Sequence, residues 1–168
     1  MSISGASKDG PLDNSDVGLL IAMLRFAALI SRPMRDGVAI PAGISPNELK
    51  IVMALAGEGE RAGHELAELM GMQPMNVSRA LAALAERGWV EQVTDASNRR
   101  RKPHRLTETG VAAYRAMAPE ISEVARFLFQ TLDVNERDGM AGVLDKLYRQ
   151  VMLWEGRGAD EAAAPRDA

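Results

Sequence analysis

Apolar residues recur at three- and four-residue steps in several stretches of the chain, which is the spacing of an amphipathic helix. From Ser15 to Arg32 the apolar pattern is broad and predicts a first helix that is mostly buried. The helix is then expected to break in a segment that is rich in proline and glycine, containing Pro33, Gly37, Pro41 and Gly43. We therefore expect the next helix to begin after this segment.

The middle of the chain predicts three further helices. Ser45 is a suitable N-cap, Pro46 fits the first helical position and Glu48 completes a capping box. The stretch GHELAELMGM then predicts a short helix that ends at Gly71, and QPMNVSRALAALAERG predicts a second one that ends at Gly88. Two short helices joined by a glycine-containing turn are typical of a helix-turn-helix.

Two short strands are predicted directly after these helices. WVEQV has strand character, DASNRRRK is polar and charged, and KPHRLT leads into another helix. This order of strand, charged loop and strand describes a wing. Pro103 falls where the returning strand should pair, and proline cannot donate to a ladder, so that strand is expected to be short, at an edge or bulged.

The C-terminal part predicts two long helices. The first covers residues 108–132 with Pro119 expected to bend it, and the second begins with Asp133 as N-cap and runs to Trp154. Apolar stripes at both ends of the chain exceed what one unit of this size needs, so we infer a homodimer built from the terminal helices. The predicted fold is mainly α with a small β wing: a winged helix-turn-helix core over about 44–107, flanked by dimerisation helices over about 15–32 and 108–154.

Charge and composition indicate a single domain over residues 15–155. The chain has 168 residues, 46% of them hydrophobic, and a net charge of −3. Residues 1–16 and 155–168 each carry −2, which leaves +1 for the middle. The segments 1–14 and 156–168 lack an apolar period and are expected to be disordered.

A cytoplasmic protein without a membrane span is expected. The longest apolar stretch, Val17 to Ile30, is interrupted by Arg25 and is shorter than the roughly 20 residues that a spanning helix needs. The polar N-terminus does not resemble a secretion signal.

Several kinds of chemistry are not expected. The chain has no cysteine, which excludes disulfides, thiolate zinc sites and cysteine nucleophiles. Its two histidines, His64 and His104, show no metal-ligand spacing, so no metal site is expected, and His104 is assigned instead to support phosphate binding beside the arginines. There is no glycine-rich phosphate loop, no G-x-S-x-G motif and no recognisable triad, so we expect neither an enzyme nor a cofactor.

The order and spacing of several short motifs resemble the MarR family of winged helix-turn-helix transcription factors over about residues 15–154. The family's E-L-A is matched by residues 65–67, and its T-V-S-R is similar to residues 76–79, which begin with Asn76. Its E-x-x-G-hydrophobic-V is similar to residues 86–90, where one residue separates Glu86 from Gly88. The D-R-R of the wing is similar to residues 98–100, and L-T-x-x-G to residues 106–110. Asn98 and Gln92 depart from the pattern, so a wing salt bridge common in the family is expected to become a neutral hydrogen bond.

Exposed side chains at the start of the second helix of the helix-turn-helix are candidates to contact DNA. Gln73, Asn76 and Arg79 can hydrogen bond to base edges. Pro74 and Met75 can touch a thymine methyl group, and Ser78 suits a phosphate. The alternative is that Gln73 and Asn76 only cap the helix and that Arg79 pairs with a surface acid.

The wing adds a dense group of cations, Arg99, Arg100, Arg101, Lys102 and Arg105. Such a group attracts phosphates and releases counterions, although charge runs are often only solvated faces. The resemblance implies that one wing arginine enters the minor groove, and Arg100 is our choice between Arg99 and Arg100.

The predicted function is a transcriptional regulator, most often a repressor, that binds a pseudo-palindromic operator on double-stranded DNA as a homodimer. The resemblance also implies a small, frequently aromatic effector. The competing hypothesis is a winged-helix protein-interaction module, which the modest net charge would suit.

Overall fold

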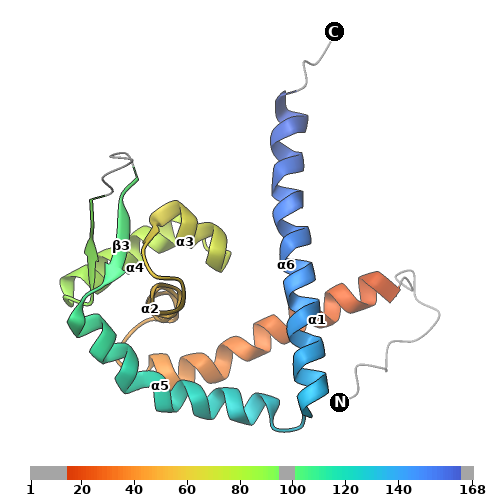
Figure 1. Cartoon of the computed structure of the whole chain (residues 1–168), viewed down its shortest axis with the longest axis horizontal. Coiled ribbons are helices and arrows are strands. Elements are labelled where there is room, and N and C mark those ends of the chain that lie inside the picture. Colours follow the sequence, from red (N-terminus) through yellow and green to blue (C-terminus); the bar gives the residue numbers. More distant parts are fainter. Residues whose placement is uncertain (1–14, 95–100, 164–168) are drawn as a thin grey trace. The chain divides into compact units, whose positions relative to one another are not determined.

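The computed structural model describes residues 15–94 and 101–163, and the side chains of residues 16–94 and 101–154 (Figure 1). Contacts divide the chain into two compact units, one up to Val124 and one from Ala125 onward. The first unit contains all the short helices and the strands.

The first helix is longer than the sequence pattern predicts. Helix α1 spans Ser15–Met34 and continues directly into a π-helical turn, η2, at Arg35–Ala39. The predicted break therefore begins later than Pro33, with a turn at residues 40–43 inside the predicted segment. In the π turn the Ile40 N–H donates to the Arg35 carbonyl over 2.9 Å, a wider ring than that of an α-helix.

Helix α1 is also less buried than predicted. Leu19, Leu24 and Leu29 are 60–64% exposed, so the expectation of a mostly buried helix is wrong for the single chain. The segment Asp16–Ala39 is long and apolar enough to cross a membrane by length and composition, with none of its apolar window buried. This helical segment is longer than the apolar stretch from Val17 to Ile30 on which the expectation of no membrane span was based.

Helix α2 forms the centre of the first unit. It spans Pro46–Glu58 and begins with the predicted capping box: the Glu48 N–H donates to Ser45 Oγ over 3.2 Å, and the Ser45 N–H donates to Glu48 Oε2 over 3.3 Å. Ile51 and Val52 are completely buried. Figure 1 shows α2 nearly end on, with α3, β3 and α5 around it.

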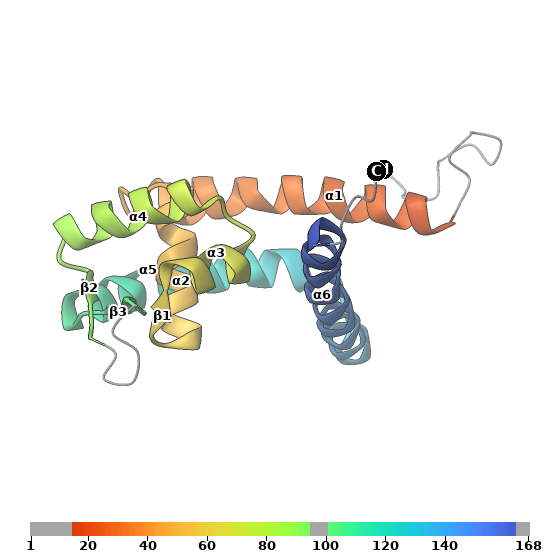
Figure 2. The ribbon, with the colours of Figure 1, turned by 90° about the horizontal axis from the view of Figure 1, so that it is seen from above.

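Helices α3 (Gly63–Met70) and α4 (Pro74–Glu86) follow α2, as the sequence predicts. Figure 2 shows them from above, one after the other along the chain. Their buried side chains join those of α2 in one core, to which α3 contributes Leu66 and α4 contributes Val77, Leu81 and Leu84. Burial of these apolar faces is what holds the two short helices at a fixed angle.

The strands form a three-stranded antiparallel sheet in the order β1–β3–β2. Strands β2 (Val90–Gln92) and β3 (Pro103–Leu106) are the predicted wing strands, whereas β1 (Arg61–Ala62) was not predicted. Strand β3 is short, as expected from Pro103, but it is the central strand and not an edge. Proline is tolerated there because it is the first residue of the strand and contributes its carbonyl, which accepts from the Val93 N–H over 2.8 Å.

Two long helices complete the chain. Helix α5 spans Glu108–Phe129 with Pro119 inside it, and α6 spans Val134–Ala163. The predicted cap of α6 is confirmed, because the Glu136 N–H donates to Asp133 Oδ1 and the Asp133 N–H donates to Glu136 Oε2, each over 2.9 Å. Helix α6 extends beyond Trp154, where its apolar stripe ends, and includes residues 156–163, for which disorder was expected. The predicted tail 1–14 and residues 164–168 lie outside the described residues.

Candidate nucleic-acid interface

The turn between α3 and α4 fixes the direction of α4. Gly71 ends α3 in the left-handed conformation, with φ of 58°, and the Met72 N–H donates back to the Ala67 carbonyl over 2.9 Å. Only glycine adopts this conformation at little cost. Gln73 then takes the N-cap position, and Pro74 begins α4. The structure therefore has the helix-turn-helix that the sequence predicts.

The exposed side of α4 carries all six candidate residues of this helix. Gln73, Pro74, Met75, Asn76, Ser78 and Arg79 are exposed, while Val77 and Ala80 between them are buried. Met75 is 64% exposed and is therefore available to a partner. Gln73 makes no side-chain capping bond, contrary to the capping alternative for that residue. Among the described residues, Arg79 has no ion-pair partner.

The wing cations differ from one another in their surroundings. Arg99 and Arg100, including our choice for the minor groove, lie outside the described residues. Lys102 is exposed and has no ion pair with a described residue. Arg105 is half exposed and pairs with Glu91 over 2.8 Å and with Glu60 over 3.5 Å.

Arg101 makes the most extensive ion pair of the wing. Its Nε donates to Glu65 Oε1 over 2.8 Å, and its Nη2 donates to Glu65 Oε2 over 2.9 Å. These bonds, together with the Ala62 N–H, lower the pKa of Glu65 to about 2. Sequence reasoning assigned Glu65 only to the E-L-A motif. Its position three residues after Ala62 was a signal for a cap at the start of α3, but its partner 36 residues away was not visible in the sequence.

His104 does not have the character expected of a phosphate ligand. It lies on the central strand, opposite Arg61 of β1 and Gln92 of β2. Burial lowers its pKa, which favours the neutral ring at neutral pH. Its Nδ1 is buried and has no hydrogen-bond partner among the described residues. Gln92 itself is exposed in β2, and Asn98, the other departure from the family pattern, is not described.

Trp89 connects the recognition helix to the wing and to α5. The backbone N–H of Trp89 donates to the Leu84 carbonyl over 2.9 Å, and the backbone carbonyl of Trp89 accepts from the Thr107 N–H over 3.0 Å. A side chain on Gly110 would place its Cβ only 2.0 Å from the Trp89 carbonyl oxygen. The L-T-x-x-G motif is therefore a packing requirement, since two chain segments cross at this glycine.

A cavity of about 300 Å³ lies beside Trp89. It is lined by η2 and the following turn, by Trp89 and by one face of α5, with Val38 and Met117 among its apolar residues. Glu120 is the only charged residue in its lining. Among the described residues, no group of three or more histidine or acidic side chains is arranged to hold a metal ion.

The chain matches the sequence model of the MarR family over residues 42–101, which contain α2, α3, α4 and the start of the wing. No curated protein matches the chain in sequence.

Solved structures give the same result for the fold. A MarR-family transcriptional regulator from Silicibacter pomeroyi is 20% identical, with a TM-score of 0.72, covering 87% of this chain and 96% of its own. CouR from Rhodococcus jostii, solved with p-coumaroyl-CoA, is 20% identical, with a TM-score of 0.68 over 80% of this chain and 92% of its own. BpsR from Bordetella bronchiseptica, whose DNA binding is regulated by 6-hydroxynicotinic acid, is 19% identical, with a TM-score of 0.64 over 79% and 98%.

The helix-turn-helix, the wing and the family match of residues 42–101 together define a winged helix-turn-helix fold of the MarR type. Residues 42–101 are thus similar to the MarR family.

Proposed function

We propose that this protein is a transcriptional repressor that binds a pseudo-palindromic operator as a homodimer. The observation that carries the proposal is the exposed N-terminal half of α4, where Gln73, Asn76 and Arg79 stand free of the core. The N-terminal end of a recognition helix is the part that meets base edges in the major groove. Ser78 and the wing cations Lys102 and Arg105 are assigned to phosphates, and Arg99 or Arg100 to the minor groove.

The direct test is to incubate the purified protein with sheared DNA from its own source at near-physiological salt and to sequence what is retained. We expect a palindrome whose half-sites lie about 10 base pairs apart. With that DNA, Asn76→Ala and Arg79→Ala should each weaken binding. Each should also reduce the discrimination against the wrong base at the contacted position by about 1–3 kcal/mol. Arg115→Ala, an exposed arginine on α5, is the control. Enrichment of no sequence by a folded dimer would favour the interaction module.

The exposed apolar residues support the homodimer. In the first unit, α1 exposes Leu19, Leu20 and Leu24. In the second unit, α6 exposes Val143, Val151 and, at 72%, Trp154. Apolar surface of this extent on a soluble chain marks an interface, and two half-sites on DNA require two copies. We propose that a second copy of the chain covers these helices and that the protein is cytoplasmic.

The oligomer is tested by deleting residues 143–154. We expect a monomeric or insoluble product, because the deletion removes most of the exposed stripe of α6. A soluble dimer by light scattering would contradict the proposed interface.

The alternative partner for the apolar segment Asp16–Ala39 is a lipid bilayer, because the segment is long and apolar enough to cross one. Flotation of the full-length protein with phosphatidylcholine and phosphatidylglycerol vesicles tests for it, and the proposal expects no flotation.

We also propose a small aromatic effector and place it in the cavity beside Trp89. The cavity volume of about 300 Å³ suits a single-ring or two-ring compound, and Trp89 and Met117 provide an aromatic and a polarisable wall. A ligand there would touch the residue that joins α4 to the wing. 6-Hydroxynicotinic acid and p-coumarate are suitable first probes, with binding followed by tryptophan fluorescence. Met117→Trp should fill the cavity and abolish the response, whereas Val134→Trp, which adds a tryptophan at an exposed position of α6 outside the cavity lining, is the matched control.

A further inference from the structure

The cations at the base of the wing fall into two groups. Arg101 uses two nitrogens to bond both oxygens of one carboxylate, at 2.8 and 2.9 Å. Lys102, the next residue, is exposed and has no ion pair with a described residue. Two adjacent cations of equal charge therefore stand in different environments.

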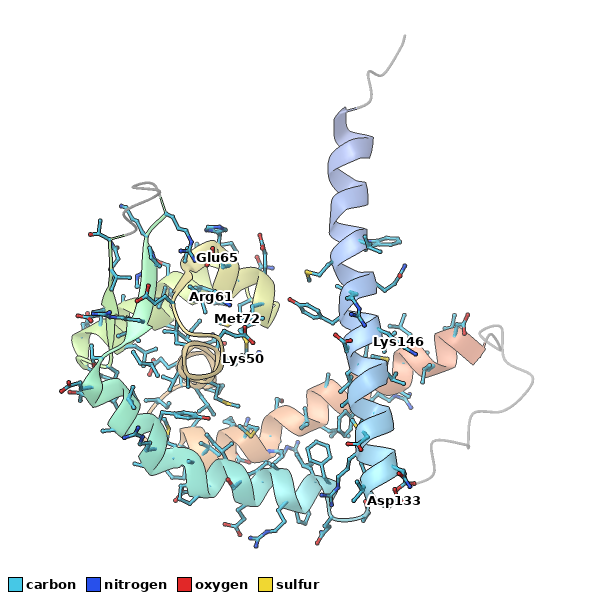
Figure 3. The ribbon with its side chains drawn as sticks, viewed as in Figure 1. Lys50, Arg61, Glu65, Met72, Asp133 and Lys146 are labelled. Atoms are coloured by element: carbon cyan, nitrogen blue, oxygen red, sulfur yellow. The ribbon has the colours of Figure 1, made fainter. Side chains whose placement is uncertain are left out.

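The partner of Arg101 holds a structural position. Glu65 Oε2 also accepts from the Ala62 N–H over 2.8 Å, which caps the start of α3 because Ala62 has no side-chain oxygen of its own. Ala62 pairs with Pro103 in the sheet. One carboxylate thus connects β1, the first turn of α3 and the base of the wing. Figure 3 labels Glu65 on α3, together with Arg61.

The ion pair is protected from water more than the others of the wing. The side chains of Arg101 and Glu65 are 30% and 28% exposed, against 51% and 48% for Arg105 and Glu91. A paired, partly buried arginine that left its carboxylate for a phosphate would break two charge-assisted bonds. It would also leave an unpaired negative charge close to the DNA.

We propose that Arg101 is a positioning residue, which fastens the base of the wing to the first turn of α3 through Glu65 and does not neutralise a DNA phosphate. The inference rests on the proposed DNA-binding function and refines it. Arg101 and Glu65 together contribute no net charge, so the phosphate-facing charge at this point of the wing belongs to Lys102. Arg101 acts on DNA binding by holding the wing at a fixed angle to α4.

Four variants separate positioning from phosphate contact: Arg101→Gln, Arg101→Lys, Glu65→Gln and, as matched control, Lys102→Gln. The affinity for the retained DNA is measured over a range of salt concentrations. Removing one phosphate contact lowers the slope of log K against log salt by about 0.9. We expect that loss of slope for Lys102→Gln and an unchanged slope for Arg101→Gln, with affinity reduced about tenfold, or about 1.4 kcal/mol.

Glu65→Gln gives opposite results under the two roles. If Arg101 positions the wing, the variant weakens DNA binding although it removes a negative charge. If Arg101 contacts a phosphate, the variant frees it and strengthens binding, which would overturn the proposal. Arg101→Lys keeps the charge but not the two-pronged geometry, so it should lose as much affinity as Arg101→Gln. Retained affinity in Arg101→Lys would also overturn the proposal.

Hydrogen exchange on the free protein supplies a readout that does not depend on DNA. The Val93 N–H, which donates to the Pro103 carbonyl over 2.8 Å, should exchange about tenfold faster in Arg101→Gln, or about 1.4 kcal/mol, and at the wild-type rate in Lys102→Gln. Equal rates in all variants would contradict the positioning role. If the wild-type protein retains no DNA, the proposed function fails while the exchange experiment still decides the role of Arg101.

Discussion

Gly110 offers the sharpest test of how the winged helix is held together. An alanine Cβ at this position would lie 2.0 Å from the Trp89 carbonyl oxygen and 2.9 Å from the Trp89 carbonyl carbon. Ordinary contact begins near 3.4 Å, so the two backbones must separate by about 1.4 Å. Both sides are backbone, and neither a rotamer change nor a flexible tip can relieve the clash.

The expected cost has two sources. Forcing an extra carbon into a packed site costs about 1–3 kcal/mol. Separating the segments also stretches the bond from the Thr107 N–H to the Trp89 carbonyl, worth about 1 kcal/mol. We therefore expect Gly110→Ala to lower the free energy of unfolding by about 2–4 kcal/mol, and the melting temperature by about 4–16 °C for a chain of this length.

Gly57→Ala is the matched control for this change. Gly57 lies in α2, has nothing within 4 Å of a built Cβ and has no positive φ. Alanine is the better helix former, so the same substitution should raise stability by about 0.5–1 kcal/mol. Urea unfolding at equal protein concentration measures both. A Gly110→Ala protein within 0.5 kcal/mol of the wild type would refute the crossing of the two segments at this glycine.

Two further predictions follow from individual contacts. Ser45→Ala should destabilise the protein by about 1 kcal/mol, because it removes the oxygen that accepts from the Glu48 N–H. Urea unfolding measures this loss, and an unchanged midpoint would contradict it. The lowered pKa of Glu65, about 2 against an ordinary 4.5, stabilises the folded state above pH 4.5, and this contribution should be lost as pH falls from 4.5 towards 2. Since the group is partly exposed, we expect about 2 kcal/mol, seen as a shallower acid destabilisation in Glu65→Gln than in the wild type.

The sequence by itself determined the features that depend on neighbours along the chain. The capping box at Ser45, the left-handed Gly71 and the cap of α6 at Asp133 are local hydrogen-bond arrangements, and all are found where they were predicted. The alternation of buried and exposed residues on α4 also follows from helical periodicity. These local signals were sufficient for the helix-turn-helix, the wing strands and the resemblance to the family model over residues 42–101.

Only the tertiary structure decided what lies beside these elements. The central place of β3 depends on pairing with Arg61 and Ala62, a segment too short to have a strand pattern of its own. Helix α1 includes Pro33 and continues into a π turn, which periodicity does not indicate. The different surroundings of the wing cations have the same origin. Arg101 and Lys102 are adjacent and carry the same charge, but only Arg101 pairs with Glu65, which lies 36 residues away in the chain. Contacts between distant residues carry no local pattern, and they decide which cations are paired within the protein.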